Sequence, residues 1–226
     1  MGNGTLQTLD RGIEALLLIA RTPGGVKVGE LAGRLNLHRA IAYRIVATLA
    51  DRGMVRRLDD GRIVLGAAAF LLAAQAGGIV RSLARPVLED LAEQTGATAF
   101  LSMAEGAECV VVLTAEPREA DVNIHYRVGT RHPIDRGAAG IAILSTRPER
   151  PDDSVDIRFA RAHGYSVTRG QLHKGAVGVS SPVRLPSEAF AGMDYSIGVV
   201  ALETLEMDMV CRAVPEAARA LSARFA

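Results

Sequence analysis

The chain has 226 residues, of which 49% are hydrophobic and 23% are charged, so it can form one large or two smaller packed domains and is not disordered. No apolar run reaches the roughly 18 residues of a membrane helix, and the first residues lack the basic and apolar regions of a secretion signal. Cys109 and Cys211 form no CxxC motif, which indicates reduced thiols. We therefore expect a cytoplasmic protein with no membrane contact.

The net charge of +1 conceals an uneven distribution along the chain. Residues 1–66 carry ten Arg and Lys against six Asp and Glu, a net charge of +4, whereas residues 67–226 carry sixteen against nineteen. A small basic end on a nearly neutral body suits DNA binding by that end, although many domains reach this charge without such a partner.

Two helices are predicted first. One begins at Leu9 with Thr8 as its N-cap and ends at the Thr22–Gly25 turn. Its apolar residues fall on one face, namely Leu9, Ile13, Leu16, Leu17 and Ala20. The second runs from about residue 29 to residue 35, and Asn36 follows it as a turn residue that tolerates the left-handed conformation.

A third helix is predicted over residues 38–52, and Gly53 ends it. Its expected buried side is Ile41, Ile45 and Leu49, flanked by Ala42 and Val46. Two β-like runs, 54–58 and 62–65, then enclose Asp59-Asp60-Gly61, and Asp-Gly between such runs is a strong hairpin signal. Three helices followed by a basic hairpin predict a winged helix-turn-helix in residues 1–66.

Residues 67–76 are apolar on nearly every face of a short helix, so something must cover them. The cover is either the rest of the chain or a second subunit, and we assign residues 67–82 as a linker helix. Residues 83–226 then alternate irregularly between helices, at about 86–96, 137–145, 156–163 and 209–225, and strands, at about 98–103, 109–114, 122–128, 177–183 and 197–202. This pattern predicts an α+β domain with an antiparallel sheet flanked by helices.

The exposed side of the third helix is the predicted DNA-reading element, because a helix fits the major groove and its outward side chains reach base edges. Arg39, Ala40, Tyr43 and Arg44 are the candidate base-reading positions. His38 and Thr48 are expected to contact phosphate, and the wing residues Arg56, Arg57 and Arg62 to follow the DNA backbone or the minor groove. The alternative is that these arginines form a solvated helix face.

Over most of its length, the sequence resembles the IclR-type transcription regulators. The resemblance is carried by LDRGIEALLLIA, VGELAGRLNLHRAIAYRIVATLADRGMVRR, GRIVLG, ARPVLEDLAEQTG, VGTRHPIDRGAAGIAIL, IRFARAHGYSV and GAVGVSSPV, in the order of the family. It implies a winged-helix domain, a linker helix and a GAF-like domain that binds a small effector. It also implies a homodimer or a dimer of dimers that binds a double-stranded DNA operator.

Three departures from the family pattern stand out. Ala40-Ile41 replaces the usual Ser-Thr, which removes one or two DNA contacts, and Ile141 replaces a common Lys. The segment 146–155 is short and rich in Pro and Asp where the family has a few dozen residues, so one or two peripheral helices are expected to be missing.

The same resemblance places the effector at the start of helix 137–145. Gly137, Ala138 and Ala139 are small there, and a helix N-terminus attracts carboxylates. The alternative is that Gly137–Gly140 is simply a tightly packed helix start. The other positions carried over from the family are Thr168, Gly178, Ser180, Ala201 and Glu203. The family often has more polar residues at several of these positions, so the ligand is expected to be larger or less polar than a small keto acid.

Catalytic motifs are missing from the sequence. There is no GxGxxG, Walker motif, complete nucleophile elbow, HxxxH or HExxH. We therefore expect no enzyme activity, no catalytic residue, no metal and no cofactor. The alternative to a regulator is a small-molecule-binding or catalytic α+β protein whose helix-turn-helix is only structural.

Overall fold

The computed structural model describes residues 6–75, 78–119, 126–185, 193–202 and 206–225. The chain divides into two compact units, Met1–Gly78 and Ile79–Ala226. Each unit has its own hydrophobic core, and each is described below by itself.

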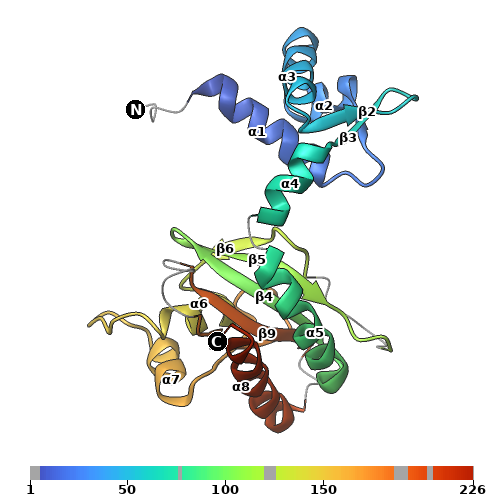
Figure 1. Ribbon diagram of the computed structural model, residues 1–226. Coiled ribbons are helices and arrows are strands. Elements are labelled where there is room, and N and C mark those ends of the chain that lie inside the picture. The colour runs from blue at the N-terminus through green and yellow to red at the C-terminus, as the bar shows by residue number, and fades with distance from the viewer. Residues whose placement is uncertain (1–5, 76–77, 120–125, 186–192, 203–205, 226) are drawn as a thin grey trace. The chain divides into compact units, whose positions relative to one another are not determined.

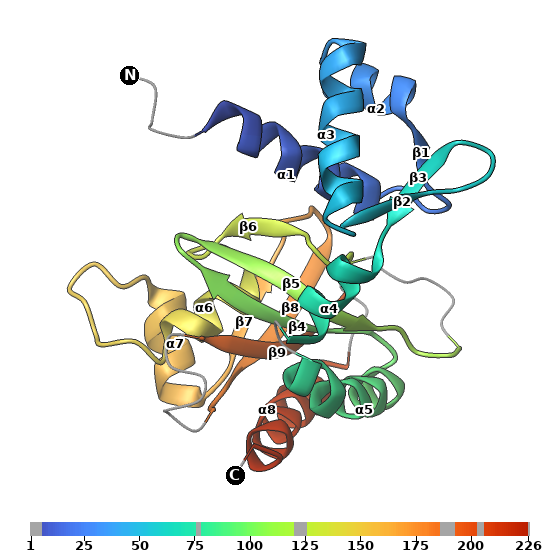
Figure 2. The same cartoon turned by 45° about the horizontal axis from the view of Figure 1, so that its top comes forward.

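The N-terminal unit is a winged helix-turn-helix (Figure 1). Its elements in chain order are α1 (Gln7–Ala20), β1 (Val26–Lys27), α2 (Val28–Arg34), α3 (Arg39–Asp51), β2 (Val55–Arg57), β3 (Arg62–Leu65) and α4 (Ala67–Gln75). The strands form an antiparallel sheet in the order β1-β3-β2, and α3 packs beside β2 (Figure 2). The predicted helices and hairpin of residues 1–66 are thus confirmed, and the short strand β1 was not expected. Of the predicted linker helix over residues 67–82, only residues 67–75 form α4, and residues 78–82 belong to the helix that begins at Gly78.

The orientation of α1 differs from the prediction. The helix begins at Gln7 and its N-cap is Leu6, which makes no side-chain hydrogen bond, so Thr8 is not the cap. Ala15 and Ile19 form its buried side, and Leu16 and Leu18 pack against the same core. The stripe formed by Leu9, Ile13 and Leu17 is instead exposed by 60%, 50% and 48%.

The C-terminal unit is an antiparallel sheet covered by helices on both faces. Its elements are α5 (Gly78–Thr95), β4 (Thr98–Glu105), β5 (Glu108–Ala115), β6 (Arg131–Pro133), α6 (Gly137–Leu144), α7 (Val155–His163), β7 (Ser166–Arg169), β8 (Ala176–Val183), β9 (Tyr195–Leu202) and α8 (Met207–Ala223). The six strands are ordered β6-β5-β4-β9-β8-β7, and every neighbouring pair is antiparallel. The predicted α+β class is confirmed.

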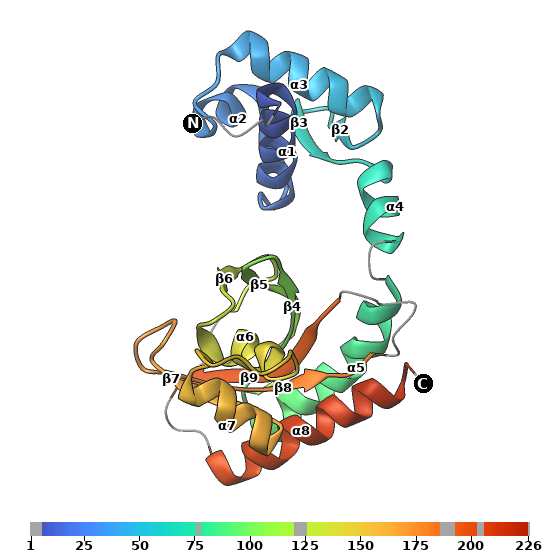
Figure 3. The ribbon, with the colours of Figure 1, turned by 90° about the vertical axis from the view of Figure 1, so that its left-hand side faces the viewer.

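Two separate cores define the two faces of this sheet. On one face, α5 and α8 run side by side and pack on alternate residues of the central strands (Figure 3). On the other face, Ala139 and Ile143 of α6 pack on Phe100, Val111 and other residues of the sheet. α7 in turn packs on α6 through Ile157. α6 therefore packs between the sheet and α7.

The predicted strand and helix bounds fail at three places in this unit. Of the strand expected at 122–128, residues 122–125 lie outside the described residues and 126–128 are not a strand; the short β6 follows instead. Strand β7 was not predicted. α5 begins eight residues before Pro86, which lies inside the helix rather than in its first turn.

Close backbone packing fixes the position of α6. A Cβ at Gly140 would lie 2.1 Å from the carbonyl oxygen of Ile134, which is backbone and cannot rotate away. Gly140→Ala is therefore expected to destabilise this unit by about 1–3 kcal/mol or more, because the added methyl group would displace α6 from the backbone of Ile134. Urea unfolding should show it as a lower transition midpoint, with Gly33→Ala, at a site where nothing lies within 4 Å, as the matched control. Equal midpoints for both variants would contradict this view of the helix.

Candidate DNA-binding face and effector site

The turn between α2 and α3 sets the direction of α3. Asn36 adopts a left-handed backbone with a φ of 50°, and the Leu37 N–H donates to the carbonyl of Ala32 at 2.8 Å. His38 then serves as the N-cap of α3 through its backbone, with no side-chain hydrogen bond. The helix buries Ala42, Ile45 and Val46, which pack it against α1 and α2.

The opposite side of α3 is exposed. It presents His38, Arg39, Ala40, Tyr43, Arg44, Ala47 and Thr48 to solvent, as expected from the sequence. Ile41 joins this exposed side, being 37% exposed, so its predicted place in the core is wrong. Ile45 stays in the core as predicted, and the predicted flanking residues Ala42 and Val46 are buried beside it, so the buried face lies further from Ile41 than expected.

The arginines of this face differ in how freely they can reach a ligand. Arg39 lies against the start of α2, since a Cβ at Gly29 would come within 2.9 Å of its Nη2. Arg44 has no salt bridge within the described residues. The Thr48 hydroxyl donates to the carbonyl of Arg44 at 2.9 Å, which occupies its hydrogen within the helix. Arg44 is thus the most available cation of α3.

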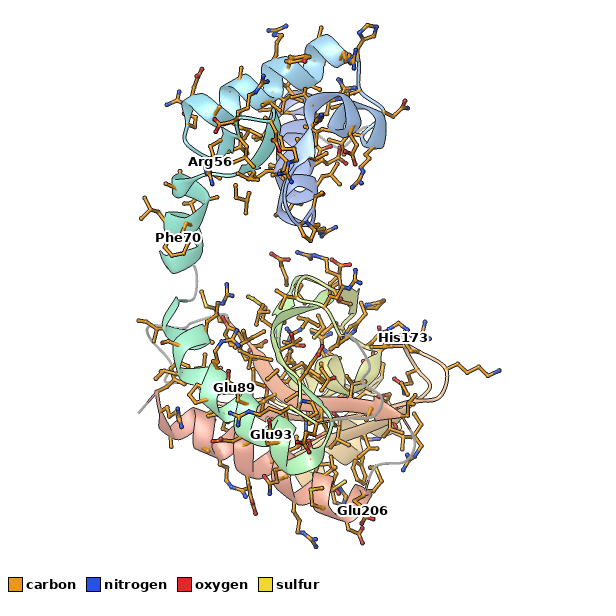
Figure 4. The ribbon with its side chains drawn as sticks, turned by 90° about the vertical axis from the view of Figure 1, so that its right-hand side faces the viewer. Arg56, Phe70, Glu89, Glu93, His173 and Glu206 are labelled. Atoms are coloured by element: carbon orange, nitrogen blue, oxygen red, sulfur yellow. The ribbon has the colours of Figure 1, made fainter. Side chains whose placement is uncertain are left out.

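The three arginines of the wing also differ in whether they are paired within the protein. Arg56 and Arg57 are exposed on β2 and have no ion pair in the described part of the chain, and Figure 4 marks Arg56 on this strand. Arg62 instead binds Asp60, with 2.6 Å between Nε and Oδ2, and donates to the carbonyl of Gly24 at 2.6 Å. Hydrogen bonds from the Arg62 backbone N–H and then from its side chain lower the pKa of Asp60, so Asp60 and Arg62 together brace the hairpin.

In the C-terminal unit, a cavity of about 30 Å³ lies beneath α6. This volume is room for about two water molecules. Its lining is mostly apolar and combines sheet, helix and loop residues: Phe100, Tyr126, Ala138, Ala139, Thr168, Gln171, Leu172, His173, Ala176, Gly178 and Val200. The rings of Phe100 and Tyr126 meet edge to face at 5.1 Å.

Four of the predicted effector residues line this cavity, namely Ala138, Ala139, Thr168 and Gly178. Gly137 begins the helix beside it with a φ of 77°, a conformation that favours glycine. The cavity does not include Ser180, whose hydroxyl donates to the carbonyl of Ile197 at 3.0 Å.

The remaining two predicted effector residues lie elsewhere. Ala201 packs on the core of the opposite sheet face, whereas its neighbour Val200 lines the cavity. Glu203 lies outside the described residues. The cavity residues that the sequence did not indicate are Phe100, Tyr126, Gln171, Leu172, His173, Ala176 and Val200; strand alternation alone could have pointed to Val200.

The loop between β7 and β8 closes the cavity. Gln171 holds it in place, because its Oε1 accepts from the Gly137 N–H at 2.9 Å and its Nε2 donates to Asp156 of α7 at 3.0 Å. Arg136 adds a hydrogen bond to the carbonyl of Gln171 at 3.0 Å. A neutral amide oxygen thus occupies the first N–H of α6, where an anionic group would otherwise be attracted.

Buried groups beside the cavity are held in their neutral forms. Burial raises the pKa of the Cys109 thiol to about 11. Burial also raises the pKa of Tyr126, and the nearby Cys109 adds to the rise. Neither group is therefore ionised at neutral pH, so a nucleophilic role for Cys109 is not supported.

Within the described ranges, no group of three or more His, Cys, Asp or Glu residues is placed to hold a metal ion. Among the described helices, none combines the length and apolar character that crossing a bilayer requires.

A helix-turn-helix with an exposed basic face, followed by a unit with a cavity under a helix start, is the architecture of a DNA-binding transcription regulator. Two family models match the chain in this order: the IclR helix-turn-helix domain at residues 8–59 and the bacterial transcriptional regulator IclR C-terminal domain at residues 77–155. The chain belongs to the IclR family of transcription regulators.

Named relatives agree with this assignment. The chain is 29% identical to the HTH-type transcriptional regulator BhcR of Paracoccus denitrificans, over 97% of this chain and 88% of that protein. It is 25% identical to the transcriptional repressor IclR of Escherichia coli, over 65% of this chain and 55% of that protein. The resemblance noted in the sequence is confirmed.

Solved structures share the fold. An IclR transcriptional regulator from Alicyclobacillus acidocaldarius matches with a TM-score of 0.76 and 22% identity, over 98% of this chain and all of that one. An IclR homologue from Microbacterium hydrocarbonoxydans, crystallised with 4-hydroxybenzoate, matches with a TM-score of 0.77 and 19% identity, over 96% of this chain and 98% of that one.

Proposed function

We propose that the protein is a ligand-responsive regulator that binds a double-stranded DNA operator as a homodimer or dimer of dimers. Residues 1–66 bind DNA, residues 67–82 form the linker, and residues 83–226 bind the effector. The observation that carries this proposal is the exposed side of α3, where Arg44 stands without an ion pair within the described residues. Such a protein acts where the chromosome is, in the bacterial cytoplasm, and performs no catalysis.

Exposed apolar residues of the N-terminal unit support a dimer. The stripe of α1 is one such surface, and Leu6 extends it. On α4, Phe70 is 75% exposed and stands out from the helix (Figure 4), with Leu71 and Leu72 also exposed. Exposed apolar surface of this kind marks interaction sites. A twofold dimer would place two recognition helices about 34 Å apart, which requires a pseudo-palindromic operator.

The effector of this proposal is a small organic molecule with aromatic or carboxylate character. The cavity is apolar and lined by two aromatic rings, and it lies beside the start of α6. Since the cavity holds only about two waters, a ligand must move the Gln171 loop to enter. The 4-hydroxybenzoate bound by the Microbacterium hydrocarbonoxydans homologue suggests the size of ligand to test. Differential affinity for the effector would then shift the DNA-binding equilibrium.

A salt titration of DNA binding tests the function. A dimer with six to ten phosphate contacts should lose roughly 10³- to 10⁵-fold in operator affinity between about 50 and 200 mM salt, because released counterions drive binding. The double variant Arg56→Ala/Arg57→Ala removes two contacts from each subunit, so it should make the salt slope of the dimer shallower by about four.

The outcomes separate the two hypotheses. Binding that is absent at low salt would favour a ligand-binding protein whose helix-turn-helix is only structural. A slope that the wing variant leaves unchanged would remove Arg56 and Arg57 from the phosphate contacts. Retained, salt-dependent binding with the shallower slope in the variant would support the regulator.

A further inference from the structure

A buried histidine beside the start of α6 has a hydrogen-bonding atom with no partner among the described residues. His132 lies on β6 opposite Cys109 of β5, and it is 6% exposed. Residues directly opposite in an antiparallel pair share a face of the sheet, so the His132 ring lies on the face that α6 covers. It is the only histidine among the buried residues of the described chain.

The hydrogen bonds of His132 define which nitrogen carries the proton. Its Nδ1 lies 2.9 Å from the carbonyl oxygen of Pro133, and a carbonyl only accepts, so in the neutral ring Nδ1 is the donor. Nε2 is then an acceptor. It is buried and finds no hydrogen-bond partner among the described residues. A buried acceptor without a donor costs free energy, which a ligand donor would recover.

The ring of His132 lies beside the start of α6, next to a residue that lines the effector cavity, although His132 is not itself one of the lining residues. A Cβ at Gly137 would be 3.5 Å from Cε1 of His132, the ring atom next to Nε2, and 2.6 Å from Cδ1 of Leu172, which lines the cavity. The ring edge thus lies at the start of α6, close to the lining. Tyr126 and Phe100 contribute the aromatic walls of the same cavity.

We propose that His132 is an effector-recognition residue whose Nε2 accepts a hydrogen bond from a hydroxyl group of a compact aromatic ligand. This inference rests on the effector site of the proposed function and names the chemistry that the site selects. A carboxylate does not suit Nε2 of the neutral ring, because it would bring one acceptor against another. A hydroxyl supplies the donor, and the aromatic body fits the apolar walls.

Matched probes test this proposal on the full chain. Calorimetric titration should compare benzoate with 2-, 3- and 4-hydroxybenzoate, which differ from benzoate only by a hydroxyl. We expect at least one isomer to bind roughly tenfold more tightly than benzoate, the gain of about one hydrogen bond. His132→Leu should remove that preference and leave the benzoate affinity within about twofold.

Two control variants separate loss of the Nε2 acceptor from a general effect of replacing a histidine. His132→Gln, which retains an acceptor, should restore part of the preference. His163→Leu, at an exposed histidine of α7 whose Nδ1 faces the carbonyl of Phe159, should leave it intact. In imidazole ¹⁵N spectra of the wild-type protein, the Nε2 resonance of His132 should shift to a hydrogen-bonded value when the preferred isomer is added.

Three results would overturn the proposal: no binding of any hydroxybenzoate, equal binding of benzoate and all isomers, or a preference that survives in His132→Leu. All of them are read from ligand binding. Operator binding is measured separately, with the ligand-free wild type and the His163→Leu control. A failure of the regulator hypothesis would instead appear as absent operator binding in both proteins.

Discussion

Arg44→Ala is expected to weaken operator binding by about 1–3 kcal/mol, which corresponds to roughly 5- to 150-fold in affinity. The physical reason is that Arg44 is exposed on α3 without an ion pair in the described residues, so its guanidinium is free to bind guanine or phosphate. Fluorescence anisotropy with operator and with unrelated duplex would measure both affinities.

The pattern of loss identifies the contact. If Arg44 reads a base, binding to the operator falls while binding to unrelated DNA changes little, and Arg44→Lys does not restore it, because Lys lacks the bidentate fork. If Arg44 holds a phosphate, both affinities fall together and the salt slope of the dimer drops by about two, one for each subunit. Arg219→Ala, which removes a charge from α8, is the control. Unchanged operator affinity in Arg44→Ala would remove this residue from the DNA-binding set.

The helices and the wing of the N-terminal unit were predictable because their signals are local. Asn36 makes the turn before α3, and the Asp-Gly pair forms the tight connection of the hairpin. The face that each helix buries was less predictable. In α1 both sides are apolar, so spacing alone could not choose between the Ile13 side and the Ile19 side. Packing against α3 and β3 makes that choice, and it depends on contacts far apart in sequence.

The effector cavity was predictable at α6 and much less so elsewhere. The small residues at 137–139 already indicate a close approach to a helix start. The other walls depend on strand register, which decides that Val200 rather than Ala201 faces α6. Gln171 and Leu172 come from a loop whose position is set by long-range hydrogen bonds. The role of His132 could not be predicted from the sequence, because it depends on burial and on hydrogen-bond partners that only the folded structure shows.

Ile13→Glu is expected to convert the protein to a monomer and to reduce affinity for a full operator by at least about 100-fold. Two linked half-sites gain roughly 10²- to 10⁴-fold from effective concentration, and a charge in the stripe of α1 removes that gain. Light scattering should give the mass, and anisotropy should compare full operator with a single half-site, for which the variant retains its affinity.

The variant should remain folded, because Ile13 is half exposed and lies outside the buried side of α1. Val155→Glu makes the same chemical change at an exposed position of α7 in the other unit and serves as the matched control. Phe70→Glu asks the same question of α4. If Ile13→Glu stays dimeric and Phe70→Glu becomes monomeric, the dimer rests on α4 alone. If both remain dimers with full operator affinity, the subunit interface lies outside the N-terminal unit, and the operator geometry must be set by contacts between C-terminal units.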